Sequence, residues 1–339
     1  MAGFTIPFFS AARYLSRNVS LFMPSASAAF CLLPPLALNA TTASRNSSSL
    51  RAMITSFVGE RKSVDLAAKG CRGFRLRIVV LRFSRGRITA MPVANLPLHI
   101  AAKYSLDHRR FIARNPKLAE PTAYCPCCGS SFKEWRPVFG RGRKAECHVC
   151  HSFERHRHIW LTIDADRDFF SKGSKLLHFA PEPFFKNVFG QNPNLDYFDC
   201  DLAKERATYQ VDITAIPFGD EKFDRVICSH VLEHVPDDRK GMSEMFRVLK
   251  PGGIAYVMVP SEVRAATYED PAINTPELRL KHYGQATHVR IYSRDDFVAR
   301  LQECGFVVEV QFPRRKYGEE MCKDFLLGDN IYICSKPDY

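Results

Sequence analysis

Acidic residues are almost absent from the start of this chain. There is none in the first fifty positions, and only Glu60 and Asp65 occur before residue 90, against 13 lysines and arginines. The formal net charge of +12 therefore belongs almost entirely to residues 1–90. Residues 91–339 hold 35 basic and 34 acidic residues, so overall basicity gives no reason to assign them a nucleic-acid-binding function.

A long uninterrupted apolar segment is also lacking. The uncharged residues 19–44 are interrupted by Pro24, Pro34 and Pro35. Each proline removes a backbone donor that lipid cannot replace, so we predict no transmembrane segment. An acid-poor leader with interspersed arginines is typical of an organellar transit peptide. The alternatives are a disordered leader, one absent from the functional protein, or a secretory signal.

Five of the twelve cysteines lie between residues 125 and 150. Cys125 and Cys128 form one pair and Cys147 and Cys150 another, in the spacing C-x2-C-x18-C-x2-C. This spacing is typical of a zinc site, because two tight turns bring four thiolates around one ion. Gly129 supplies the backbone freedom for the first turn. Four protein ligands leave no open position, so we predict a structural zinc ion.

The ligand assignment has alternatives, since Cys127, His148 or His151 could replace one of the four cysteines. Thiolate ligation favours a reducing compartment and argues against secretion. We therefore expect a cytoplasmic protein, or one in a mitochondrion or plastid if the leader is a transit peptide.

Polar residues crowd the segment after the second cysteine pair. Ser152 is expected to cap a helix that begins with Glu154, Arg155, His156 and Arg157. We favour a solvated helix face that links the zinc-binding module to the next domain. The alternative is a surface that binds an anionic or polar substrate.

Short apolar runs alternate with helical patterns from Lys175 onward. An amphipathic helix is predicted at 238–249, and Ser293 and Asp296 are predicted to form a capping box for a helix that ends at Gly305. Strands are predicted at 176–180, 195–200, 225–228, 254–259, 306–310 and 330–334. The alternation predicts an α/β fold with a doubly wound, mostly parallel sheet and a ligand crevice at the carboxyl ends of its strands.

Three motifs follow one another within this region. They are Asp212-Ile-Thr-Ala-Ile-Pro-Phe218, Phe223-Asp-Arg-Val-Ile-Cys-Ser-His-Val-Leu-Glu-His-Val-Pro236 and Phe246-Arg-Val-Leu-Lys-Pro-Gly-Gly253. Together they resemble the type 11-like core of class I S-adenosylmethionine-dependent methyltransferases. The resemblance extends from Tyr124 to the C-terminus and implies a Rossmann-like sheet, S-adenosylmethionine as cofactor and methyl transfer by in-line displacement.

The predicted organisation has five parts. They are a basic leader at 1–90, a linker at 91–123, a zinc-ribbon-like module at 124–152, a connecting helix at 153–172 and the methyltransferase domain at 173–339.

The resemblance implies a set of cofactor-binding residues. An acidic residue at the end of the second strand binds the ribose hydroxyls in this family, and Asp201 has that place, with Asp199 as the alternative. Asp212 would face the adenine amino group, and Ile213 would pack on the adenine ring. Helix or turn capping is the other interpretation of both Asp201 and Asp212.

The first motif departs from the family pattern because it contains no glycine. His178, Ala180 and Glu182 stand where the family has an acidic residue and two glycines. Either the loop takes another path, with Glu182 meeting the methionine ammonium, or cofactor binding has been weakened or lost. We expect the first.

Four polar residues follow the predicted strand at 225–228, where the resemblance implies residues that face the cofactor and the acceptor. Ser229 is predicted to contact the cofactor, and His230, Glu233 and His234 are the candidate catalytic residues. A structural histidine at the sheet edge is the alternative for His230.

Residues 262–292 have the place of a substrate lid, and Asp270, His288 and Arg290 are its candidate substrate-binding residues. A polar connecting loop would have a similar composition. The acceptor is not identified by the sequence, and we expect a small molecule rather than RNA. The alternatives are an RNA methyltransferase that binds its substrate through the zinc ribbon, and a non-catalytic binding protein with a methyltransferase fold.

Overall fold

The computed structural model describes residues 96–138 and 143–338, together with the backbone of four short strands nearer the N-terminus. These are β1 (Val64–Ala67), β2 (Arg75–Ile78), β3 (Leu81–Phe83) and β4 (Arg87–Thr89). The chain forms two compact units, residues 1–105 and 106–339. Most of the predicted leader lies outside the described residues, and so do the predictions about targeting. The second unit contains the candidate sites.

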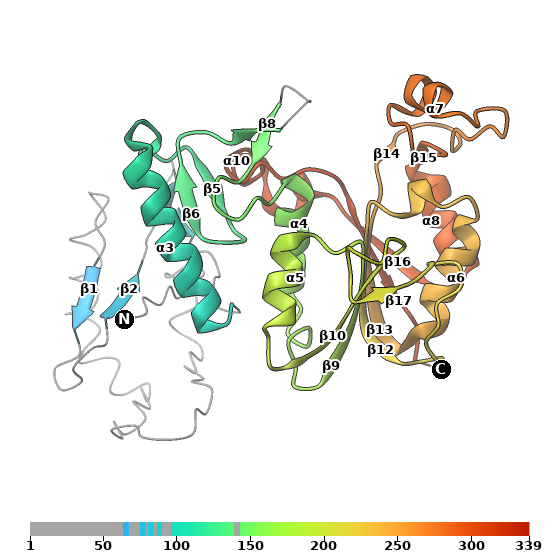
Figure 1. The fold of residues 1–339 in the computed structure, drawn as a ribbon, viewed down its shortest axis with the longest axis horizontal. Coiled ribbons are helices and arrows are strands. Elements are labelled where there is room, and N and C mark those ends of the chain that lie inside the picture. The colour runs from blue at the N-terminus through green and yellow to red at the C-terminus, as the bar shows by residue number, and fades with distance from the viewer. Residues whose placement is uncertain are drawn as a thin grey trace. The chain divides into compact units, whose positions relative to one another are not determined.

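A seven-stranded sheet is the centre of the second unit (Figure 1). Its spatial order is β11 (Tyr209–Gln210), β10 (Leu195–Asp201), β9 (Ser174–Phe179), β12 (Phe223–Ser229), β13 (Leu249–Met258), β17 (Ile331–Ser335) and β16 (Val307–Gln311). The strands from β11 to β13 pair in parallel, and β17 is antiparallel to both its neighbours. The predicted fold class is confirmed, with a topological switch point between β9 and β12.

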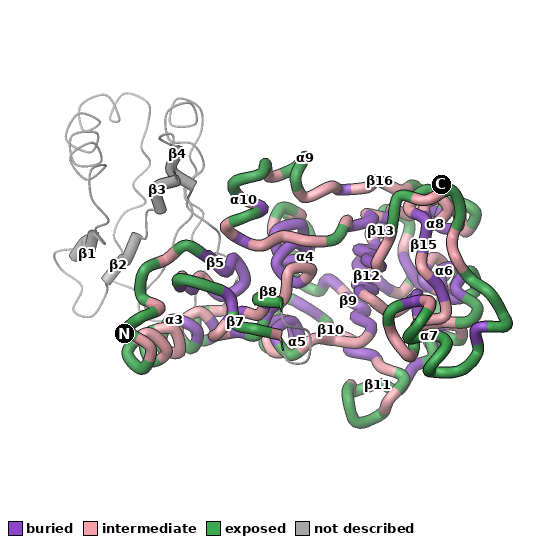
Figure 2. The backbone as a smooth tube through the Cα atoms, turned by 90° about the horizontal axis from the view of Figure 1, so that it is seen from above, coloured by how far each residue is buried: buried purple, intermediate pink, exposed green. Residues whose placement is uncertain are grey.

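Helices cover both faces of this sheet. Helices α4 (Glu154–Ala165) and α5 (Pro183–Gly190) lie on one face, and α6 (Asp238–Val248) and α8 (Arg294–Glu303) on the other (Figure 1). The central strands between them are largely buried (Figure 2). They read as nearly continuous apolar runs because both of their faces are covered, which is why the sequence predicted them well.

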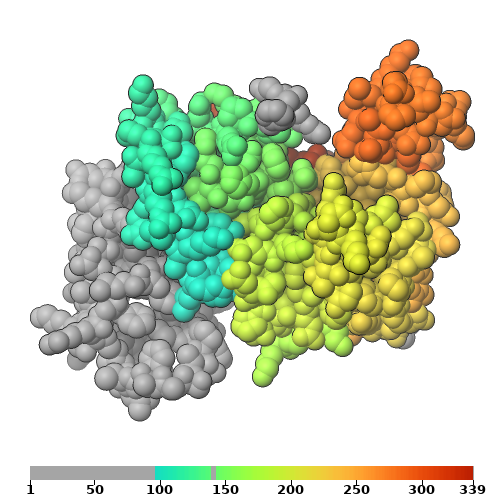
Figure 3. Space-filling model, viewed as in Figure 1, coloured from blue at the N-terminus to red at the C-terminus, as the bar shows by residue number. Residues whose placement is uncertain are grey.

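Two smaller parts flank the carboxyl end of the sheet. One contains the hairpins β5 (Ala123–Cys125) with β6 (Ser130–Phe132) and β7 (Arg136–Pro137) with β8 (Lys144–Glu146). The other contains β14 (Ser261–Glu262), α7 (Pro276–Tyr283) and β15 (Tyr292–Ser293). In the space-filling view of Figure 3 a hollow separates these two parts.

The remaining elements connect these parts. They are helix α3 (Leu98–Arg114) and the 3-10 turn η1 (Pro116–Leu118), both within the predicted linker, the 3-10 turn η2 (Leu232–His234), α9 (Pro313–Tyr317) and α10 (Glu319–Asp324). Among the described residues, none of the helices combines the length and the apolar character that crossing a membrane requires.

Both predicted serine caps are wrong. Ser293 lies at the N-cap of α8, but its hydroxyl donates to the Arg264 carbonyl, and Asp296 instead pairs with Arg300. Phe153 rather than Ser152 is the N-cap of α4. In both cases a tertiary partner competes successfully with the local backbone for the serine hydroxyl.

His158 joins α4 to the sheet and makes stability depend on pH. Its Nδ1 donates to the Asp329 carbonyl at 2.9 Å, and its Nε2 lies 3.1 Å from Gln311 Nε2. Burial lowers the pKa of His158 to about 4. As the pH falls from about 6.5 toward 4, the unfolded chain takes up a proton that the folded chain does not, so stability is lost in that window.

We therefore expect His158→Gln to remove part of the acid sensitivity. The wild-type free energy of unfolding should fall by up to about 3 kcal/mol more than that of the variant between pH 7 and pH 4. Urea unfolding of both proteins across this range measures the difference. Equal pH dependence of the two would contradict the assignment.

Candidate active site

The carboxyl edge of the sheet is marked by three non-glycine residues with left-handed backbone. These are Ala180 after β9 (φ 48°), His230 after β12 (φ 54°) and Asp329 before β17 (φ 55°). Each such conformation costs about 1–2 kcal/mol, and such residues cluster at functional sites. Ala180 adopts the conformation that a glycine usually supplies, and its N–H donates to the Cys200 carbonyl at 2.8 Å. The glycine-free first motif therefore still makes a tight turn.

Glu182 lies at the centre of a buried polar group in the first loop. Its carboxylate is 3.0 Å from His156 Nε2, 3.3 Å from His178 Nε2 and 3.8 Å from Arg155 Nε. Burial alone would raise the pKa of Glu182, but the two histidines outweigh it and hold the pKa well below its usual range. Glu182 is therefore a carboxylate at neutral pH.

The contacts around Glu182 are close but poorly aligned. Glu182 Oε2, both histidine Nε2 atoms and Arg155 Nε are buried and have no hydrogen-bond partner among the described residues. A buried polar atom without a partner costs about 1–3 kcal/mol, and such atoms in a crevice indicate a ligand that would satisfy them. His178 is fully buried against Phe185 and Phe189, so its contact with Glu182 comes from the hydrophobic interior.

His230 lies between two carboxylates. Its Nδ1 is 3.3 Å from Glu233 Oε1, and its Nε2 is 3.4 Å from Asp329 Oδ2. Burial lowers the pKa of His230, but Asp329 and Glu233 raise it to about 9. The ring is therefore charged at neutral pH. The hydroxyl of Ser229 is buried beside it and has no hydrogen-bond partner among the described residues.

Two contributors to this site were missed by the sequence analysis. Asp329 is distant from every motif, and only the turn-forming residues Gly328, Asp329 and Asn330 before a predicted strand could have marked it. The other contributor is α4, which brings Arg155 and His156 to the site. The predicted solvated helix face is wrong, because His156 and Arg157 are buried and Arg155 Nε is buried as well.

The acidic residues predicted to bind the cofactor at β10 and after β11 differ in whether their side chains are available. Asp201 ends β10, and its Oδ1 accepts from Ala203 N at 2.8 Å. Asp199 is paired with Lys186 at 2.7 Å and is not available. Asp212 is exposed and accepts from Thr214 N. Ile213 is 5% exposed within the hydrophobic core, and its packing on an adenine ring stays a prediction.

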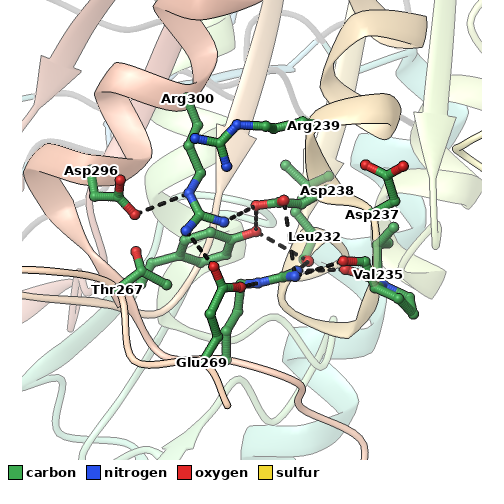
Figure 4. Close-up of polar contacts among 12 residues, drawn as sticks. Leu232, Val235, Asp237, Asp238, Arg239, Thr267, Glu269, Asp296 and Arg300 are labelled. Atoms are coloured by element: carbon green, nitrogen blue, oxygen red, sulfur yellow. Dashed lines mark hydrogen bonds and ion pairs between the residues drawn. The ribbon is translucent and has the colours of Figure 1, made fainter. Parts of the chain in front are cut away.

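Arg290 anchors the predicted lid to the sheet instead of facing an acceptor. Its guanidinium is buried, donates to the carbonyls of Leu232, Val235 and Pro236, and pairs with Glu269. All of these contacts are internal, so the prediction that Arg290 binds the acceptor is not supported. Figure 4 shows that Arg300 pairs with Glu269, Asp238 and Asp296, which fixes the same segment from α8.

The other two candidates on this segment have different surroundings. Asp270 lies in an exposed turn, where its Oδ1 accepts from Ala272 N at 2.8 Å. His288 is half-buried, and its ring centroid lies 4.7 Å from that of His234. Only His288 of these two thus lies beside a predicted catalytic residue.

The four cysteines predicted to bind zinc form one buried cluster. The Sγ atoms of Cys125, Cys128, Cys147 and Cys150 all lie within 4.8 Å of one another. The turns that contain the two cysteine pairs have the same backbone geometry. Gly129 N donates to Cys125 O and His151 N to Cys147 O, and both Gly129 and His151 have positive φ.

This donor set fits a tetrahedral zinc ion. Cys127 is buried outside the cluster, while His148 and His151 contact Glu134 and Glu146, so none of the three replaces a member of the cluster.

We expect Cys147→Ser to lose about one zinc per chain and to destabilise the module, because structural zinc supplies on the order of 10 kcal/mol to such folds. Elemental analysis of the purified variant measures the loss. Cys127→Ser is the matched control and should keep its zinc. Loss of zinc in the control with retention in Cys147→Ser would contradict the ligand set.

Comparison with known proteins found similar sequences and structures. Residues 172–257 match a family model described as a methyltransferase domain. A probable S-adenosylmethionine-dependent methyltransferase of Mycolicibacterium smegmatis is 31% identical over 121 residues, which is 34% of this chain and 43% of the relative. A ubiquinone/menaquinone biosynthesis C-methyltransferase of Geobacter sulfurreducens is 44% identical over 55 residues, or 16% of this chain and 22% of the relative. The chain therefore spans less than half the length of each relative.

Solved structures of low identity are also similar. An S-adenosylmethionine-dependent methyltransferase of Mesorhizobium loti has 12% identity and a TM-score of 0.38, covering 52% of this chain and 96% of that one. The family model, the first of these relatives and the sheet order agree with the motifs. Residues 172–257 in the second unit therefore match a methyltransferase domain, and the fold of this unit is that of class I S-adenosylmethionine-dependent methyltransferases.

Proposed function

We propose that this protein transfers a methyl group from S-adenosylmethionine to a small polar acceptor. The observation that carries the proposal is the group of buried polar atoms without hydrogen-bond partners at the carboxyl edge of the sheet, on both sides of the switch point. Within the described residues they come from Arg155, Glu182, Ser229, His230 and Glu233. A ligand with several polar groups would satisfy them.

The charge of this edge complements the cofactor. Three carboxylates, those of Glu182, Glu233 and Asp329, face two cations, Arg155 and His230. The cofactor carries a sulfonium, an ammonium and one carboxylate, so it is positive overall. Carboxylates at this edge would stabilise such a ligand.

The cofactor would be held by residues from three strand ends. Asp201 would accept both ribose hydroxyls, Asp212 the adenine amino group and Glu182 the methionine ammonium, while Ser229 lies at the next strand end. The bound cofactor supplies the electrophilic methyl group. The left-handed turn at Ala180 leaves the backbone free to pass close to it.

The residues around His230 would then position the acceptor. Methyl transfer from a sulfonium is an in-line displacement, and its acceleration comes mainly from alignment of the acceptor atom with the methyl group. His230 is fixed by Glu233 and Asp329 at the end of β12, where the acceptor would approach.

We expect the zinc-loaded protein to bind S-adenosylmethionine in a calorimetric titration, and Asp201→Asn to raise the Kd about tenfold to a hundredfold. The reason is the loss of charge-assisted hydrogen bonds to the ribose, worth roughly 1.5–3 kcal/mol. Asp196→Asn, on the exposed side of the same strand, is the matched control and should bind normally. If the folded wild type does not bind S-adenosylmethionine, the proposed methyl transfer is wrong, and the alternative is a non-catalytic binding protein with a methyltransferase fold.

We further expect labelled methyl groups to pass from the cofactor into the small-molecule fraction of a cell extract. His230→Asn should lower this transfer at least tenfold while the cofactor Kd changes little, because His230 is assigned to the acceptor side. Chromatography of the labelled products provides the measurement. Label that appears only in RNA would overturn the small-molecule assignment in favour of the RNA methyltransferase alternative.

A further inference from the structure

We propose that Glu233, His234 and His288 form a binding site for a divalent first-row transition-metal ion, separate from the cysteine cluster. One ligand atom from each residue lies within 4.8 Å of the other two. Two imidazoles and one carboxylate form the donor set of zinc sites and of iron(II) sites that keep open coordination positions. With a single carboxylate, the set is poorly suited to calcium or magnesium, which prefer oxygen ligands.

Glu233 provides the first independent support. Its side chain is 1% exposed, and neither carboxylate oxygen has a hydrogen-bond partner among the described residues. His230 Nδ1 lies 3.3 Å from Oε1, but Oε2 has no comparable contact with a cation in this part of the chain. A buried carboxylate with an unused oxygen is costly unless a cation binds it.

The orientation of His234 provides the second. Its Nδ1 lies 3.2 Å from the Thr287 carbonyl oxygen. Because a carbonyl only accepts, this nitrogen carries the proton, and Nε2 is the nitrogen with a free lone pair. Imidazoles that bind metal ions typically donate their other N–H to a carbonyl or carboxylate in this way, which fixes the tautomer and the ring orientation.

The two segments that supply the ligands are held together independently of any ion. Val289 N donates to the Glu233 carbonyl at 2.9 Å. Arg290 donates to the carbonyls of Leu232, Val235 and Pro236, which flank the ligands Glu233 and His234 in the sequence. Figure 4 shows this clamp closed by Glu269 and Arg300. The ligand set, which spans 55 positions of sequence, is therefore preorganised.

Only side-chain movement is needed to close the site. The rings of His234 and His288 are nearly perpendicular, at 78°, with centroids 4.7 Å apart. A tetrahedral ion with bonds of about 2.1 Å requires ligand atoms about 3.4 Å apart. The ligand atoms already lie within 4.8 Å of one another, so an approach of about 1.4 Å or less closes the site.

The position of the site suggests what the ion would do. Glu233 contacts His230, so the ion would lie one side chain away from the residue assigned to the acceptor. Three protein ligands leave at least one position for water or for an oxygen of the acceptor. The metal site itself stands on its own ligands and does not depend on the proposed methyl transfer.

The test is a cobalt(II) titration of the full-length protein whose cysteine cluster is already filled with zinc. We expect one equivalent of cobalt to bind with visible d–d absorption bands but without the thiolate-to-cobalt charge-transfer band of a cysteine site. His288→Gln and His234→Gln should each raise the cobalt Kd at least tenfold. His282→Gln is the matched control, because this histidine lies on the same segment but contacts Tyr268.

A second readout guards against misfolded variants. Cobalt should raise the Tm of the wild type and of His282→Gln, as expected for a ligand that binds only the folded state, and should not raise that of His288→Gln. The proposal is overturned if cobalt gives no d–d bands with the wild type, or gives them only together with the thiolate-to-cobalt charge-transfer band. Equal cobalt affinity in all four proteins, or equal loss in the control, would overturn it as well.

Discussion

The guanidinium of Arg157 is a buried cation whose partners are backbone carbonyls and one aromatic ring. It donates to the carbonyls of Ala145 and Ser152 in the cysteine module and to those of Phe325 and Leu326 before β17, and it lies 3.9 Å over Trp135. Burying a charge costs several kcal/mol unless its donors are all used. The cysteine module, α4 and the loop before β17 must therefore stay together.

This constraint shapes the candidate active site. Arg155 and His156 precede Arg157 on α4, and Asp329 follows the loop that Arg157 binds. Their positions beside Glu182 and His230 thus depend on a residue that itself lies away from the crevice. The cysteine cluster contributes to the same arrangement, because the Ser152 hydroxyl lies 3.2 Å from Cys125 Sγ while its carbonyl accepts from Arg157. The cysteine cluster and the polar residues of the candidate active site are therefore connected through Ser152 and Arg157.

A second buried cation group fixes the opposite side of the crevice. Arg290 and Arg300 share Glu269 and Asp238, which joins the α7 segment to α6, α8 and η2. With both sides anchored, the polar residues at the ends of β9 and β12 are held in a fixed setting. Fixed polar groups stabilise charge without reorganising during a reaction, which would favour the proposed methyl transfer.

Local patterns in the sequence determined much of this protein. Apolar runs buried on both sheet faces predicted the strands, and the paired cysteines predicted the cluster, because each depends on neighbours close in sequence. The serine caps failed because their hydroxyls found partners elsewhere in the fold. The burial of Ile213 in the core could not be read from the sequence, because it depends on packing between distant elements.

Only the tertiary structure decided that α4 and Asp329 reach the crevice, that Arg290 is structural, and that Glu233, His234 and His288 converge. Contacts between residues this far apart in sequence are set by how the whole chain packs, and no local pattern encodes them.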